Sequence, residues 1–230
     1  MRIDILTLFP ELFPGPLGGS VIGRAVRQKL VTVNAVDVRS FATDARGTVD
    51  EKPYGGGPGM LMIPEVLTRA IESVRDAAST VILTSPRGEV MNQRLAAELA
   101  KEEHLVLIAG HYEGVDQRVI DLMVDREISI GDFVLSSGNI AVMAIADAVI
   151  RLLPGVLGDA GSTVEESHSM GLLEYPQYTR PPEFRGLKVP EVLLGGDHGK
   201  VVEFRKREAE RITRQRRPDL WEKYLQTELK

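Results

Sequence analysis

The feature that most constrains the fold of this chain is the alternation of short apolar β-type runs with amphipathic helical patterns. Strands are expected over residues 3–9, 33–38, 80–84, 105–109 and 127–130. Helical periodicity predicts helices over residues 64–76, 92–102, 115–124 and 140–153. This order is typical of an α/β domain with a mainly parallel sheet, in which ligands bind outside the carboxyl ends of the strands.

Composition narrows the class of protein further. Hydrophobic residues make up 43% of the 230 residues and charged residues 27%, as in a globular protein. The most apolar stretch, 141–153, is interrupted by Asp147 and Arg151, and the amino terminus lacks a cleavage pattern, so we expect neither a membrane span nor a secretion signal. The absence of cysteine excludes disulfides, thiolate zinc sites and cysteine nucleophiles, and fits a cytoplasmic location.

Charge and periodicity divide the chain into parts. Residues 198–230 contain 10 Lys and Arg against 6 Asp and Glu, a net charge of +4, whereas residues 1–197 contain 18 and 27, a net charge of −9. The stretch 154–171 is rich in Gly, Ser, Asp and Glu and has no periodicity, as in a linker. We therefore expect an α/β domain over 1–157, a flexible linker over 158–172, and a small helical domain over 173–230, with helices over 200–215 and from Pro218.

Three loops at the expected carboxyl ends of strands combine glycine with polar residues. They read TSPRGE (84–89), AGHYEGVD (109–116) and SIGDFVLSSGN (129–139). Meeting at one sheet edge, they would form a pocket for an adenosine-like ligand, with Asn139 as the N-cap of the next helix. Ordinary strand-to-helix turns explain the same composition equally well.

The segment PYGGGPGM (53–60) is the most glycine-rich part of the chain. It is neither a P-loop nor a dinucleotide-binding turn, because the spacing and the flanking elements differ. It is either a flexible turn or a place where the backbone comes close to a flat base, with Tyr54 available to stack.

Several charged residues have both a structural and a functional interpretation. Glu165, Glu166 and His168 in the linker are either solvated or include a general base that is completed when substrate binds. Arg151 either complements the dipole of the helix that it ends or faces a developing oxyanion. On the tail helix, one face carries four cations at helical spacing, which favours phosphate binding over a merely solvated surface: Lys200, Arg207, Arg211 and Arg214.

Taken together and in order, the motifs PYGGGPGM, HYEGVDQR, SIGDFVLSSG, PGVLG, LLEYPQYTRP and RRPDL closely resemble the bacterial tRNA (guanine-N(1))-methyltransferases of the SPOUT superfamily. The resemblance covers nearly the whole chain. It implies a SPOUT-type α/β fold with a deep trefoil knot, an obligate homodimer whose active sites use both subunits, S-adenosylmethionine as methyl donor, and the tRNA anticodon arm as partner. It also raises Mg²⁺ as an assisting ion, although no metal-binding cluster is evident in the sequence.

The resemblance assigns roles residue by residue. Tyr54, Gly55, Gly56 and Gly57 would bind the target guanine. Arg151 would contact its oxygen and Glu166 would be the catalytic carboxylate, where the family has aspartate. The cofactor pocket would comprise Ser85, Pro86, Gly110, Tyr112, Glu113, Ile130, Gly131, Asp132, Phe133, Val134, Leu135 and Gly138. A second departure from the family is LSSGN, where a Gly-Gly pair followed by Glu is more common. The side chains of Ser137 and Asn139 must therefore be accommodated against the cofactor.

The implied reaction needs such residues. Nitrogen 1 of guanine carries a proton and attacks a methyl group only as that proton leaves, so a base such as Glu166 and a cation such as Arg151 are required. The implied product is methylated at N(1) of the guanine immediately 3′ of the anticodon. Two alternatives remain, namely a SPOUT enzyme acting on another RNA and an RNA-binding protein that has lost catalysis.

Overall fold

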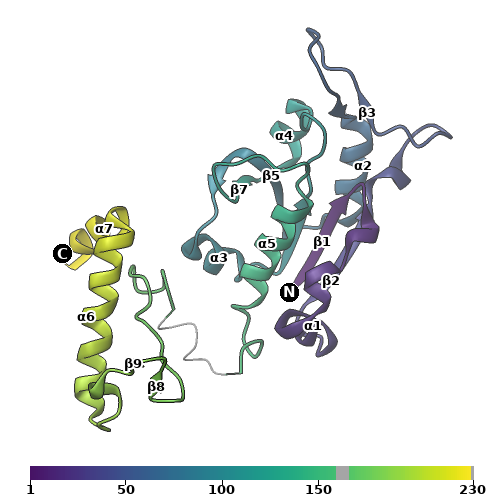
Figure 1. Cartoon of the computed structure of the whole chain (residues 1–230). Coiled ribbons are helices and arrows are strands. Elements are labelled where there is room, and N and C mark those ends of the chain that lie inside the picture. Colours follow the sequence, from purple (N-terminus) through teal and green to yellow (C-terminus); the bar gives the residue numbers. More distant parts are fainter. Residues whose placement is uncertain (159–165, 229–230) are drawn as a thin grey trace. The chain divides into compact units, whose positions relative to one another are not determined.

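The structure, a computed structural model, describes residues 1–158 and 166–228. The chain divides into two compact units, Met1–Gly158 and Asp159–Lys230, which we call the N-terminal and C-terminal units. Figure 1 labels their helices and strands. None of the described helices is long and apolar enough to cross a membrane.

A five-stranded parallel sheet forms the centre of the N-terminal unit, with strand order β2-β1-β6-β5-β7. The expected α/β class with a mainly parallel sheet is therefore confirmed. The strands are β1 (Arg2–Thr7), β2 (Thr32–Asp37), β5 (Ser79–Val90), β6 (His104–Ile108) and β7 (Arg126–Ser129).

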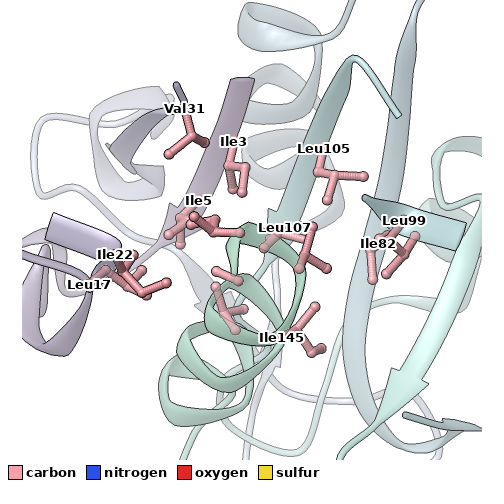
Figure 2. Packing of buried hydrophobic residues seen from close by; sticks show 14 of the residues in the cluster. Ile3, Ile5, Leu17, Ile22, Val31, Ile82, Leu99, Leu105, Leu107 and Ile145 are labelled. Atoms are coloured by element: carbon pink, nitrogen blue, oxygen red, sulfur yellow. The ribbon is translucent and has the colours of Figure 1, made fainter. Parts of the chain in front are cut away.

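Helices cover both faces of this sheet because side chains alternate along the strands. On one face, Ile3 and Ile5 of β1 and Leu105 and Leu107 of β6 pack in a cluster with Ile145 of α5 (Figure 2). The helices on that face are α1 (Ser20–Arg27), α3 (Gln93–Leu99) and α5 (Asn139–Ile150). The helices on the other face are α2 (Pro64–Val74) and α4 (Gln117–Met123).

Two elements differ from the sequence prediction. Helix α1 lies in a segment for which no element was predicted, and β5 extends well beyond its expected end at residue 84. The extension is interrupted, because both Thr84 and Glu89 pair with Ile128 of β7, so residues 85–88 bulge out of the ladder. The TSPRGE segment is therefore a bulge within a strand and not a loop after one.

A polar cluster joins the amino-terminal ends of three strands, opposite to the edge where ligands are expected. The imidazole of His104 contacts the Asp4 carboxylate through Nε2 at 2.9 Å and the Ser79 hydroxyl through Nδ1 at 2.6 Å. Asp4 also forms an ion pair with Arg2, whose Nε lies 2.9 Å from Oδ2 of the carboxylate. With His104 and Asp4 only 3% and 4% exposed, this cluster is a structural connection between β1, β5 and β6.

Short elements complete the N-terminal unit. A two-stranded antiparallel hairpin, β3 (Asp50–Glu51) and β4 (Leu61–Met62), carries the glycine-rich segment at its tip and projects from the unit in Figure 1. Single 3₁₀ turns lie at Pro10–Leu12, Gly15–Gly18 and Val38–Phe41.

The C-terminal unit is built on two helices, α6 (His198–Arg216) and α7 (Pro218–Glu228). A short antiparallel pair, β8 (Glu183–Phe184) with β9 (Leu187–Lys188), and a 3₁₀ turn at Glu191–Leu193 precede them. Of the expected linker, residues 159–165 lie outside the described residues. Its last part packs on α6, because Leu172 is buried and the Leu173 amide donates to the hydroxyl of buried Thr213 at 2.8 Å.

Candidate active site

A pocket with a volume of about 560 Å³ lies at the carboxyl ends of β5, β6 and β7. Three segments line most of it, namely the β5 bulge, the loop after β6 and the loop between β7 and α5. Small-molecule sites commonly have this size, and open parallel sheets place them at this edge. The three segments expected from the sequence to meet therefore do so, although the first is a bulge within β5.

Most of the predicted cofactor residues line this pocket. They are Ser85, Pro86, Gly110, Tyr112, Glu113, Ile130, Phe133, Val134, Leu135 and Gly138. Gly131 and Asp132 belong to the same loop but are not among the lining residues. Gly131 instead allows the loop to turn, because its φ of 146° suits glycine and a Cβ there would lie 2.6 Å from the ring of Phe133.

Gly138 brings the last of these loops into contact with the end of β6. Its amide donates to the carbonyl of Gly110 at 2.7 Å. A Cβ at Gly138 would lie 2.3 Å from Oγ1 of Thr84 and 2.6 Å from the backbone nitrogen of Gly110, closer than side chains approach. The wall of the pocket at this point thus consists of backbone in direct contact with backbone.

The expectation that Asn139 caps α5 is wrong. The N-cap is Gly138, with no side-chain cap, and Asn139 is the first helical residue, only 2% exposed. Its carboxamide is used for tertiary contacts instead, since it accepts from the Thr7 hydroxyl at 2.8 Å and contacts Nε2 of His111 at 3.2 Å. The departure from the family pattern at position 139 therefore lies beneath the pocket, in a buried polar chain.

Sequence reasoning missed His111 as a pocket residue. Its imidazole lines the pocket, packs 5.1 Å from the ring of Phe9, and is 8% exposed. Burial lowers the pKa of this imidazole below its usual value, which favours the neutral ring. His111 stands in the HYEGVDQR motif, but its buried environment depends on residues far away in the chain, which the motif does not reveal.

The β3–β4 hairpin contacts the rim of the pocket at its base. The Glu113 amide donates to the carbonyl of Met60 at 2.9 Å, and the Met62 amide donates to the carbonyl of Gly114 at 3.0 Å. Gly59 lies against Glu113 so closely that a Cβ would be 2.2 Å from Cγ of that side chain. Partial burial, with the nearby Asp50 carboxylate, raises the pKa of the Tyr112 phenol. The glycine-rich segment is therefore anchored beside the pocket.

The tip of this hairpin is open to solvent. Tyr54 is 99% exposed, and Gly55, Gly56 and Gly57 have φ values of 84°, 78° and 117°. A Cβ added at any of these three glycines would meet nothing within 4 Å. The glycines are thus needed for their backbone conformation and not for internal packing.

The two predicted catalytic residues do not line this pocket. Arg151 is the C-cap of α5, and the 12 residues of that helix separate it by about 18 Å from the pocket at the other end. Glu166 belongs to the C-terminal unit, where it is half-buried and its carbonyl accepts from the Ser169 amide at 3.2 Å. Glu165 lies outside the described residues.

Three of the four predicted cations of the tail gather around a hollow in the C-terminal unit. Arg207, Arg211 and Arg214 line it together with Trp221 of α7, which sequence reasoning missed. Trp221 stacks on Tyr224 with ring centroids 5.6 Å apart. The fourth cation, Lys200, lies at the start of α6, where its Nζ is 3.4 Å from the Asp197 carboxylate.

Metal coordination finds no support in the part of the chain that the structure describes. No group of three or more His, Asp or Glu side chains there is arranged to hold an ion. We therefore assign no residues to Mg²⁺.

Fold and pocket define an α/β protein with a cavity of small-molecule size at the carboxyl edge of its sheet. Comparison with known families identifies it further, because the family model described as tRNA (Guanine-1)-methyltransferase TrmD matches residues 1–223. The chain belongs to this family. The resemblance deduced from the motifs is confirmed, and with it the enzyme class.

Individual relatives are similar over nearly their whole length. A tRNA (guanine-N(1)-)-methyltransferase of Carboxydothermus hydrogenoformans is 54% identical over 220 residues, which cover 96% of this chain and 87% of that protein. The enzyme of the same name from Brevibacillus brevis is 52% identical, with coverage of 99% and 94%. A third, from Moorella thermoacetica, is 54% identical, with coverage of 96% and 90%.

Proposed function

We propose that this enzyme transfers a methyl group from S-adenosylmethionine to N(1) of the guanine immediately 3′ of the tRNA anticodon, in the cytoplasm. The observation that carries the proposal is the pocket, since three loops from separate parts of a family member converge on one cavity. The names of the relatives specify tRNA and guanine N(1), and the motifs around the pocket supply the finer assignment.

The pocket fits S-adenosylmethionine in size and chemistry. Apolar side chains such as Pro86, Ile130 and Leu135 suit the adenine ring, and the close-packed glycines present backbone groups to the ribose. Glu113 and Arg87 place one negative and one positive charge in the lining, as a zwitterionic amino-acid moiety requires. The bound donor would supply an electrophilic methyl carbon on a sulfonium.

In the proposed mechanism, two side chains manage the charge that develops on guanine. The Glu166 carboxylate takes the N(1) proton as the nitrogen becomes nucleophilic. The Arg151 guanidinium stabilises the negative charge on the exocyclic oxygen, as donors in an oxyanion hole do. Glutamate carries one methylene more than the aspartate of the family. The turn at 166–171 has to accommodate this longer side chain.

Two surfaces are proposed to hold the anticodon arm of the tRNA. The open hairpin tip, with Tyr54, Gly55, Gly56 and Gly57, would receive the unstacked guanine, because the glycine backbone leaves room for a flat base. Arg207, Arg211 and Arg214, with Lys200 further along α6, would bind phosphates. The half-buried rings of Trp221 and Tyr224 next to these arginines add a stacking surface.

We also propose the SPOUT trefoil knot and a homodimer with shared active sites. The dimer is supported by the position of Arg151, which lies about 18 Å from the pocket of its own chain. In a dimer, Arg151 could instead reach the pocket of the second subunit. It is further supported by α5, an almost wholly apolar helix on which Ile140 remains 58% exposed. For the knot, the family assignment and the close packing of the 130–138 loop on the end of β6 are the support.

The proposal is tested by methylation of anticodon-arm transcripts with labelled S-adenosylmethionine. Label should enter the wild-type transcript and be lost when the guanine 3′ of the anticodon is replaced by adenine. Unchanged incorporation would refute the proposed target. Calorimetry with S-adenosylmethionine alone tests the cofactor assignment separately.

A further inference from the structure

A chain of hydrogen bonds runs beneath the pocket from β1 to the loop after β6. It starts at the Phe9 amide, which donates to Oγ1 of Thr7 at 3.0 Å. It continues through the carboxamide of Asn139 and ends at the imidazole of His111, which lines the pocket. Thr7, Asn139 and His111 are 0%, 2% and 8% exposed, so water does not compete for their side chains.

The direction of each bond in this chain follows from the groups involved. Thr7 Oγ1 already accepts from the Phe9 amide, and its own proton points to Oδ1 of Asn139, 2.8 Å away. The oxygen of the carboxamide is thus fixed toward Thr7, and the NH₂ group faces His111. An NH₂ group can only donate, so Nε2 of His111, 3.2 Å away, must accept. Oγ of Ser137, 3.3 Å from the same NH₂ group, takes its second proton.

These constraints leave one protonation state for the imidazole. A ring whose Nε2 accepts carries its single proton on Nδ1. Among the described residues none accepts from Nδ1, and this nitrogen is not among the buried polar atoms that lack a partner. The Nδ1–H group therefore remains accessible on a side chain that lines the pocket.

We infer that Thr7 and Asn139 hold His111 as the neutral Nδ1–H tautomer, so that His111 offers one hydrogen-bond donor to an acceptor atom of the ligand in the pocket. Thr7 and Asn139 are positioning residues, and His111 is the contacting residue. For the identity of the ligand the inference rests on the proposed function, since S-adenosylmethionine presents hydroxyl, ring-nitrogen and carboxylate acceptors.

The tautomer is tested directly by long-range proton–nitrogen NMR of histidine-labelled protein, with the His111 signals assigned by their loss in His111→Gln. The wild type should show protonated Nδ1 and bare Nε2. In Asn139→Asp a carboxylate replaces the NH₂ group and can only accept, so Nε2 should become protonated. An Nε2–H ring in the wild type, or no change in Asn139→Asp, would overturn the inference.

Thr7 provides a second pair of variants in case Asn139→Asp folds poorly. Thr7→Val removes the hydroxyl that orients the carboxamide and should give a mixture of tautomers. Thr7→Ser retains the hydroxyl and should restore the wild-type spectrum. Identical spectra for valine and serine would contradict the role of Thr7.

Calorimetry decides whether the donor is used. Asn139→Asp should bind S-adenosylmethionine about tenfold more weakly, the loss of one hydrogen bond, whereas the exposed control His198→Gln should bind like the wild type. Unchanged affinity in a variant with an altered tautomer would overturn this inference and leave the proposed function intact. A wild-type chain that does not bind S-adenosylmethionine would overturn the proposed function and the ligand named here.

Discussion

At the scale of single residues, the proposed chemistry depends most on Glu166. Its backbone lies in a turn in which the His168 amide donates to the carbonyl of Leu172 at 2.7 Å. His168 adopts a φ of 75°, a conformation that is rare outside glycine and is maintained here by the turn. The backbone of Glu166 therefore belongs to a folded segment of the C-terminal unit, although the sequence suggests only a polar linker.

Glu166→Gln should lower kcat by about 10²–10⁴, the usual contribution of a general base, because the amide cannot take the N(1) proton. Affinity for S-adenosylmethionine should change little. Single-turnover methylation and calorimetry measure the two quantities. Glu165→Gln is the matched control and should retain turnover, and a loss of activity in Glu165→Gln alone would assign the base to the neighbouring position.

The buried imidazole of His111 should make stability depend on pH. Its pKa lies below the ordinary value of 6.5 because burial disfavours the charged ring. Below about pH 6.5 the unfolded chain therefore binds a proton that the folded chain does not, so the free energy of unfolding falls with decreasing pH and recovers above that value.

Urea denaturation at about pH 7.5 and about pH 5.5 measures this effect, and His111→Gln is the reference. The wild type should lose more stability over the interval than the variant, in which this ring is absent. Equal losses would show that His111 does not titrate differently in the folded and unfolded chains.

At the scale of elements, the contact between the 130–138 loop and β6 should limit what position 138 accepts. Gly138→Ala places a methyl group against Thr84 and the Gly110 backbone, and overpacking of this kind costs about 1–3 kcal/mol of unfolding free energy. Gly158→Ala is the control, because a Cβ there meets nothing within 4 Å. Urea denaturation should give a lower free energy of unfolding for Gly138→Ala than for Gly158→Ala. Equal values would mean that the 130–138 loop moves to make room for the methyl group without a loss of stability.

The strands and helices of the sheet were largely predictable, because each buries an apolar face with its own period. Helix α1 was not, since its segment follows a Gly- and Pro-rich stretch and contains Gly23. That glycine is required by tertiary packing, as a Cβ would lie 2.1 Å from the carbonyl of Gly18. The continuation of β5 beyond Thr84 was missed because Pro86 and Gly88 indicate a loop, whereas pairing with β7 resumes after the bulge.

The pocket was predictable for the same reason as the sheet, since parallel strands bring their following loops to one edge. The chain of hydrogen bonds beneath the pocket, formed by Thr7, Asn139 and His111, was not predictable. The contact between Asn139 and His111 joins residues 28 positions apart, and that between Thr7 and Asn139 joins residues 132 apart. Such pairings depend on the order of strands in the sheet, which local patterns do not specify.

At the scale of the whole molecule, one chain does not bring all of the proposed catalytic groups to its pocket. Gly138 at the start of α5 lines the pocket, and Arg151 ends the same helix about 18 Å away. A rigid helix cannot shorten this distance. In the proposed dimer, Arg151 would instead act at the pocket of the other subunit.

Mixing two inactive variants tests this arrangement. Arg151→Ala should lack the guanidinium and Glu113→Ala should bind the methyl donor poorly, so each homodimer should be inactive. If Arg151 serves the partner's pocket, each mixed dimer contains one site with an intact pocket and an intact arginine. Equal amounts, dissociated and reassociated, should then recover about a quarter of wild-type activity, because about half of the dimers are mixed and each has one working site of two.

If Arg151 instead serves its own chain, every site in the mixed dimer lacks one of the two groups, and no activity returns. Sedimentation analysis of the same samples shows whether dimers formed. The control mixture of Arg151→Ala with Arg151→Lys, in which lysine lacks the planar fork of guanidinium, should remain near the activity of its parents. Recovery in the first mixture alone would place the guanidinium and the methyl-donor pocket of each active site on different subunits.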